Sequence, residues 1–179
     1  MTIPSFTCHD LRAAVDFLSS PALIRLISEI DDNGPIPPRK LASTLPDLSP
    51  HHLRRINHLA RVHDLVHAAP GAGLELTASG MELADFYDAI ARWARHHAYP
   101  TRVSDFTSRI RHTLSLVESL SATDPGGGSA RQPGVEMVDT EPGVEPSEPR
   151  ALLLQWLDAY PQITALLEPD PDPDYGRAA

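Results

Sequence analysis

The sequence predicts a mainly α-helical fold with one small β-hairpin. In several segments, apolar residues recur every three or four positions, which is the spacing of one helix face. Near the middle of the chain, two short segments, 65–68 and 74–76, flank the sequence Pro-Gly-Ala-Gly at 70–73, which is typical of a hairpin turn. The 179 residues are enough for one domain of ordinary size with additional segments.

Four helices are expected before the hairpin, over about 8–19, 21–33, 38–45 and 50–62. Thr7 and Asp10 have the spacing of a capping box, which marks the start of the first helix. The sequence Asn33-Gly34-Pro35 is typical of a helix end. Ser49 as N-cap and Pro50 as the first helical residue predict the start of the fourth helix.

Two longer helices are expected after the hairpin, over about 78–97 and 102–120. Thr77 is the expected N-cap of the first, and Tyr99-Pro100 separates the two. Their apolar spacing predicts these core residues: Met81, Leu83, Ala84, Tyr87, Ile90, Ala91 and Trp93, followed by Val103, Phe106, Ile110, Leu114 and Val117. Tyr87, Trp93 and Phe106 are alternatively candidates to line a pocket between the long helices.

This order of elements is that of a winged helix-turn-helix with extra C-terminal helices. In that architecture, the helix before the hairpin enters the DNA major groove, and the hairpin touches the DNA backbone or minor groove. We assign the chain as follows: a winged-helix domain at 1–98, a dimerisation helix at 99–121, a flexible Pro/Gly/Glu linker at 122–149, a short helical segment at 150–168 and a disordered acidic tail at 169–179.

Charge is unevenly distributed along the chain. Residues 1–112 hold 12 basic and 12 acidic side chains together with all nine histidines, whereas residues 113–179 hold 3 basic and 12 acidic ones. The net charge of -9 therefore comes from the C-terminal part and does not exclude a local basic face. Two roles for this acidic part stay open, namely competition with DNA for the basic face and simple solubilisation.

The expected helix over 50–62 carries the candidate site. Leu53, Ile56 and Ala60 share one side of a helical wheel, the opposite side bears Arg and His, and residues 48–63 include no Asp or Glu. Arginine donates paired hydrogen bonds to phosphates and guanine edges, and histidine adds further donors. The candidate residues for contact with double-stranded DNA are Ser49, His51, His52, Arg54, Arg55, His58 and Arg61. An ordinary solvated helix face is the alternative interpretation.

An ordered set of residues resembles the HxlR-type winged-helix transcriptional regulators. The set consists of Gly34-Pro35, Leu41, Leu45-Pro46, Leu48-Ser49-Pro50, Leu53, Leu65-Val66, Leu76-Thr77-x-x-Gly80 and Trp93, and the resemblance covers about 8–98. It implies a homodimeric transcriptional regulator whose recognition helix runs from Ser49 to Arg61. Three features depart from the family: Ser19–Leu23 replaces a Gly-Gly-Lys-Trp-Thr stretch, the hairpin lacks Arg and Lys, and Asn57 occupies an apolar position. The alternative is a winged-helix module for protein interaction or dimerisation that has lost DNA binding.

The lone cysteine, Cys8, is a candidate redox site because the start of a helix lowers the pKa of a thiol. Its alternative role is that of a small apolar residue. An oxidant or small-molecule effector is accordingly a candidate partner. The histidines, including His63 and His67, lack the neighbouring ligands that would complete a metal site.

We expect neither catalytic activity nor a cofactor, because the sequence contains no phosphate-binding loop, nucleophile elbow or His-Glu-x-x-His motif. No apolar run approaches the length of about 20 residues that crosses a bilayer, and the N-terminus does not resemble a secretory signal. We therefore expect a cytoplasmic location without membrane association.

Overall fold

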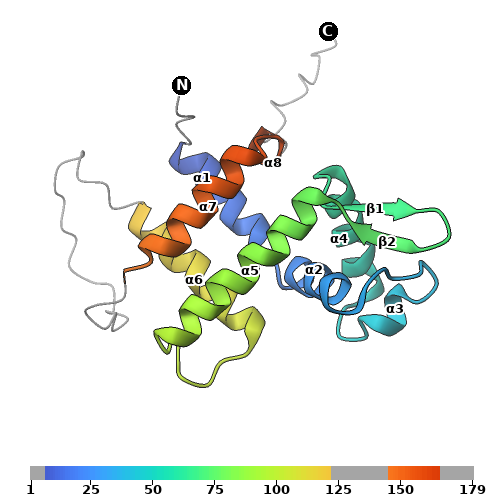
Figure 1. Cartoon of the computed structure of the whole chain (residues 1–179), viewed down its shortest axis with the longest axis horizontal. Coiled ribbons are helices and arrows are strands. Elements are labelled where there is room, and N and C mark those ends of the chain that lie inside the picture. The colour runs from blue at the N-terminus through green and yellow to red at the C-terminus, as the bar shows by residue number, and fades with distance from the viewer. Residues whose placement is uncertain (1–6, 122–144, 166–179) are drawn as a thin grey trace, which may run out of the picture.

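The computed structural model describes residues 7–121 and 145–165, and in these ranges it is mostly helical with a two-stranded antiparallel sheet (Figure 1). The elements are α1 (Cys8–Leu18), α2 (Pro21–Asn33), α3 (Leu41–Thr44), α4 (Pro50–Val62), β1 (Val66–Ala69), β2 (Gly73–Leu76), α5 (Ala78–His96), α6 (Phe106–Ser121), α7 (Ser147–Ala159) and α8 (Gln162–Ala165). Helix α5 runs across the molecule: it begins beside the hairpin and packs against α6 and α7 farther along its length.

Three predicted helix starts are confirmed by their cap hydrogen bonds. Thr7 and Asp10 form the reciprocal capping box, with N···O distances of 2.8 and 3.1 Å. The hydroxyl of Ser49 accepts from the backbone N–H of His52 at 3.3 Å, and that of Thr77 accepts from Gly80 at 3.2 Å. Local sequence therefore determines where α1, α4 and α5 begin.

The hairpin has the expected position, and a third segment adds to its edge. Val66 pairs with Leu76 and Ala69 with Gly73, so the second strand begins one residue earlier than expected. Ile36, between α2 and α3, exchanges backbone hydrogen bonds with Leu74 at 3.0 and 2.9 Å. A Cβ atom on Gly73 would collide with the carbonyl of Ile36, so this close approach requires glycine. The bridge ties the α2–α3 connection to the hairpin.

The core joins the predicted apolar faces of α1, α2, α4, α5 and α6, but two predicted core residues are exposed. Met81 lies on the outer face of α5 with 53% of its surface exposed, and Val103 is 91% exposed. Val103 precedes α6 because that helix begins at Phe106 rather than at about 102. The carboxylate of Asp105 accepts from the backbone N–H of Ser108 at 2.9 Å, and this cap starts the helix later than the apolar spacing suggests.

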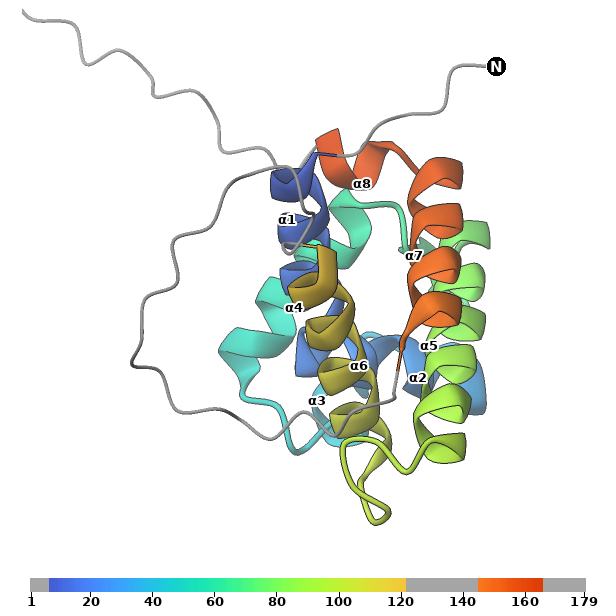
Figure 2. The ribbon, with the colours of Figure 1, turned by 90° about the vertical axis from the view of Figure 1, so that its left-hand side faces the viewer.

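The C-terminal helices belong to the core, and the prediction of a flexible linker up to residue 149 is wrong at its end. Helix α7 begins at Ser147 and buries Pro149 in its first turn, where proline is compatible with a helix. Leu153, Trp156 and Leu157 are buried, and α7 lies beside α5 in both views (Figure 2). The expected segment at 150–168 is thus two helices, α7 and α8, as far as residue 165. The rest of the expected linker (122–144) and the expected tail (169–179) lie outside the described residues.

Across 7–121 and 145–165, every helix is too short or too polar to span a membrane.

Candidate nucleic-acid interface

Helix α4 packs its apolar side against α2 and turns its basic side outward. Leu53, Ile56 and Ala60 are buried. The predicted contact residues all lie on the exposed surface: Ser49, His51, His52, Arg54, Arg55, His58 and Arg61. Amphipathic spacing produces this orientation, because burial of the apolar stripe forces the cationic stripe into solvent. We refer to these seven residues as the α4 face.

Within the α4 face, the side chains fall into two rows along the helix. His51, Arg54, His58 and Arg61 are separated by three or four positions and follow one another along one row. His52 and Arg55 belong to a second row, which borders a cavity of about 200 Å³ between α4 and the turn from α1 to α2. The face therefore presents one open row and one row beside a groove.

The arginines of the α4 face have no ion-pair partner among the described residues. The ion pairs of arginine found there belong to Arg12 and Arg25, with Glu118, Glu29 and Asp47 as partners. Arg54 donates from Nε to the backbone carbonyl of Pro50 at 3.2 Å, which leaves its terminal guanidinium nitrogens without a described partner. The positive charge of the face is thus available to an external anion.

Two further cations, Arg39 and Lys40, precede α3, and the sequence-based site did not include them. Both are exposed and, in the described part of the chain, form no ion pair. Helix α3 contacts α4, so these cations directly precede an element that packs against α4. Their adjacency in the sequence, just before a short helix, is the signal that would have suggested them.

The hairpin contributes little net charge. Nε2 of His67 lies 3.8 Å from Oε2 of Glu75 on the neighbouring strand, and the exposed tip consists of Pro70, Gly71 and Ala72. Any interaction of this tip with a polyanion would have to proceed without arginine or lysine. The hairpin is therefore electrostatically unlike the α4 face.

Two polar residues of this region are withdrawn from solvent. His63 follows α4 and is 2% exposed, with its ring 4.5 Å from that of Phe17. Burial lowers the pKa of His63, and its Nδ1 has no hydrogen-bond partner in the described structure. Asn57 is half-buried, and its Oδ1 likewise lacks a described partner. Neither residue belongs to the exposed face.

The other residues singled out in the sequence do not converge on a second site. Cys8 is the first residue of α1, and its side chain is not described. No cluster of three or more His, Cys, Asp or Glu side chains with metal-binding geometry occurs within 7–121 and 145–165. Tyr87 is fully buried and hydrogen-bonded to Leu18, as a core residue is.

Comparison with known proteins gives no match to a family model, to a curated protein or to a solved structure.

Proposed function

We propose that the protein is a sequence-specific DNA-binding transcriptional regulator of winged helix-turn-helix type. The order α2, α3, α4 and hairpin supports this proposal, as does the Ile36 bridge, which adds a third segment to the hairpin. In this arrangement α4 enters the major groove, and Arg39 and Lys40 lie near the phosphates. Arg54, Arg55 and Arg61 supply the donors that read guanine and hold the backbone.

One observation carries the proposal, namely that the arginines of the α4 face have no carboxylate partner in the described chain. An arginine that is paired within the protein would have to break that pair before it could bind phosphate. An unpaired one gains directly from the release of counterions from DNA. The absence of Asp and Glu over residues 48–63 extends the same advantage to the whole helix.

We propose in addition that the regulator is a homodimer. Two copies related by a two-fold axis would set their α4 helices about one DNA turn apart, which matches a palindromic site. Helix α7 covers part of α5 and α6, so the remaining apolar surface of α6, including Leu120 at 48% exposed, is available to a second copy. Light scattering coupled to gel filtration measures the mass of the protein in solution and so distinguishes a dimer from a monomer.

The test is fluorescence anisotropy with random genomic duplex fragments at about 50 and about 200 mM salt. We expect wild-type protein to bind with an affinity that falls steeply with salt. Replacement of Arg54 and Arg55 with alanine should weaken binding at least about tenfold. If both arginines contact phosphates, the dependence of log affinity on log salt should become shallower by about 1.8. A matched control replaces Arg92 and Arg95, two exposed arginines of α5, with alanine.

The control separates local contact from net charge. Both double variants lose two positive charges, but α5 ends far from α4 (Figure 1). We expect the α5 variant to retain affinity within about twofold. Equal losses for the two variants would mean that α4 is not the recognition helix.

A second candidate function is a winged-helix module for protein interaction. The carboxylate of Glu75, which lies 3.8 Å from the imidazole of His67, and the uncharged tip of the hairpin favour it, because a DNA-contacting hairpin normally brings a cation to a phosphate. Absence of binding to duplex DNA at both salt concentrations would select this candidate.

A further inference from the structure

An open groove lies between α5 and α7, on a different part of the molecule from the α4 face. It has a volume of about 340 Å³. Its buried part is apolar and aromatic, with Phe86 from α5 and Trp156 from α7. Glu82 and Asp85 of α5 line the same groove and are exposed. An apolar base with a few charged groups is the usual composition of a small-molecule site.

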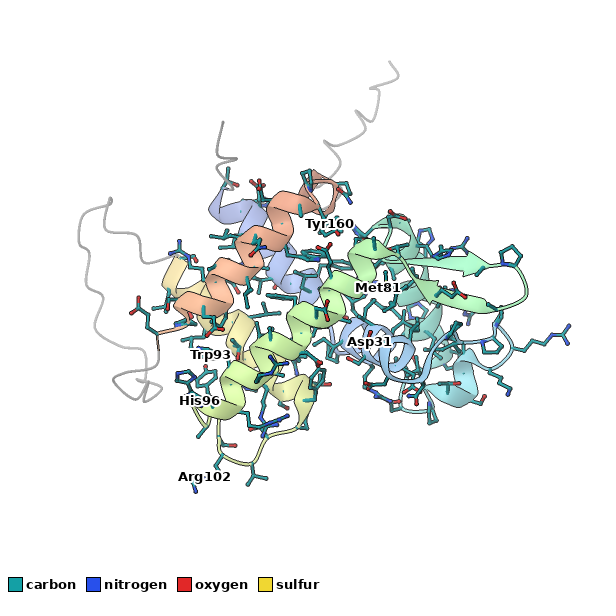
Figure 3. All side chains as sticks on the ribbon, viewed as in Figure 1. Asp31, Met81, Trp93, His96, Arg102 and Tyr160 are labelled. Carbon is teal, nitrogen blue, oxygen red and sulfur yellow. The ribbon has the colours of Figure 1, made fainter. Side chains whose placement is uncertain are left out.

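The indole of Trp156 is part of the groove lining. Trp156 is 4% exposed, and its Nε1 is enclosed and has no partner in the described structure. Tyr160, the C-cap residue of α7, has its ring 5.4 Å from that of Trp156. Figure 3 shows Tyr160 at the end of α7, near the start of α5 where Met81 is labelled. Two adjacent aromatic rings thus accompany the two carboxylates, and aromatic faces attract organic cations.

The negative charge beside the groove is not paired with a cation. Glu82 and Asp85 form no ion pair with any described residue. Glu82 does lie close to the hydroxyl of Tyr160, whose pKa is raised first by burial and then by Glu82. Further carboxylates lie on the neighbouring surface. The pKa of Asp31 is raised first by burial and then by the negative charges of Asp32, Asp88 and Asp85. Carboxylates that repel one another in this way are stabilised by a cation placed between or beside them.

We propose that the groove between α5 and α7 binds a small organic cation with a flat apolar or aromatic body. The body would pack on Phe86, Leu152 and Trp156, and the positive charge would lie beside Glu82 and Asp85. The combination selects against anions and against purely inorganic cations, which gain nothing from the apolar base. This inference does not depend on DNA binding.

The test uses two dyes with a common xanthene ring system and opposite charge, the cationic rhodamine 123 and the anionic fluorescein. Anisotropy of each dye is measured while full-length protein is added. We expect rhodamine 123 to bind with a dissociation constant in the micromolar range and fluorescein to bind at least about tenfold more weakly. Binding of rhodamine 123 should weaken as salt is added, because the carboxylates are exposed.

Variants then locate the bound dye. Replacement of Glu82 with Gln and Asp85 with Asn should weaken the binding of rhodamine 123 at least about tenfold, since both carboxylates that attract its positive charge are neutralised. The control replaces Glu148 with Gln and Asp158 with Asn, which are exposed residues of α7 outside the groove lining. It makes the same change in net charge and should leave affinity within about twofold.

Trp156→Phe provides a second, independent variant that keeps the apolar base and removes only the indole. We expect this variant to bind rhodamine 123 about threefold more weakly than wild type. The proposal is overturned if rhodamine 123 fails to bind at millimolar protein, if the two dyes bind equally, or if the Glu82/Asp85 variant and its control bind alike. None of these readouts involves DNA, so they fail or succeed separately from the proposed function.

Discussion

The phenolic hydroxyl of Tyr87 donates a hydrogen bond of 2.7 Å to the backbone carbonyl oxygen of Leu18, and both residues are fully buried. Leu18 is the last residue of α1, where carbonyl groups have no partner within the helix. Tyr87 lies in the middle of α5. The bond therefore satisfies an otherwise unpaired carbonyl and fixes α5 against the turn from α1 to α2, which borders α4.

Tyr87→Phe should destabilise the protein by about 1–3 kcal/mol, because the buried Leu18 carbonyl loses its donor and no water replaces it. Urea unfolding followed by circular dichroism measures the change. Tyr99→Phe is the matched control, since no described hydrogen bond of the Tyr99 hydroxyl is lost and Tyr99 is half-buried. Similar urea midpoints for the two variants would show that the hydrogen bond of Tyr87 adds no stability.

The same residue shows what the sequence could and could not predict. Apolar spacing placed Tyr87 in the core, because spacing depends only on the helix to which it belongs. Its hydrogen bond could not be predicted, since it depends on how α5 crosses α1, 69 residues away in the chain. The exposed face of α4 could be predicted in the same way, because it depends only on spacing within one helix. The groove between α5 and α7 could not be predicted, because it depends on how two distant helices pack.

The errors at α6 and α7 have a different origin. Val103 fits the apolar spacing of α6, but Asp105 caps the helix after it. At α7, proline-rich composition indicated a linker, although Pro149 is compatible with a first helical turn. The short helical segment that includes Trp156 is predicted by apolar spacing, but its packing against α5 depends on tertiary structure. Deletion of 122–179, the obvious test of the acidic part, would accordingly remove core helix α7 as well.

His63 predicts a dependence of stability on pH. Burial lowers its pKa from the ordinary value of 6.5, so the unfolded chain binds a proton more readily than the folded one. The stability that neutral His63 provides is present above about pH 6.5 and is lost as the pH falls through the lower, folded-state pKa. Protonation would place a charge beside Phe17 at the C-terminal end of α4.

We expect His63→Phe to reduce this acid sensitivity. Phenylalanine keeps an aromatic ring against Phe17 but does not titrate. The measurement is the urea unfolding free energy at about pH 7.5 and about pH 5 for wild type and variant. His58→Phe, at an exposed position of α4, should retain the pH dependence of wild type. If His63→Phe and His58→Phe lose the same stability on acidification, His63 is not the responsible group.

Gly80 provides a test of packing between α5 and the start of the hairpin. A Cβ atom at this position would collide with the backbone carbonyl oxygen of Leu65, which a side-chain rotation cannot relieve. Gly80→Ala should therefore cost about 3 kcal/mol or more. Gly71→Ala at the hairpin tip has no atom within 4 Å but has a φ of +83°, and should cost only about 1–2 kcal/mol. Thermal unfolding of the two variants in parallel measures the difference.

The uncharged hairpin tip allows a gain-of-function test of the DNA-binding proposal. If the hairpin approaches a phosphate when α4 is in the major groove, Ala72→Arg should strengthen DNA binding about three- to tenfold at about 50 mM salt. Log affinity should also fall more steeply with log salt. The slope should become more negative by about 0.9, the value for one added phosphate contact. Ala151→Arg, at an exposed position of α7, adds the same charge away from α4 and should change affinity less than twofold. Equal gains for the two arginines would mean that long-range attraction alone is responsible, and that the hairpin does not touch DNA.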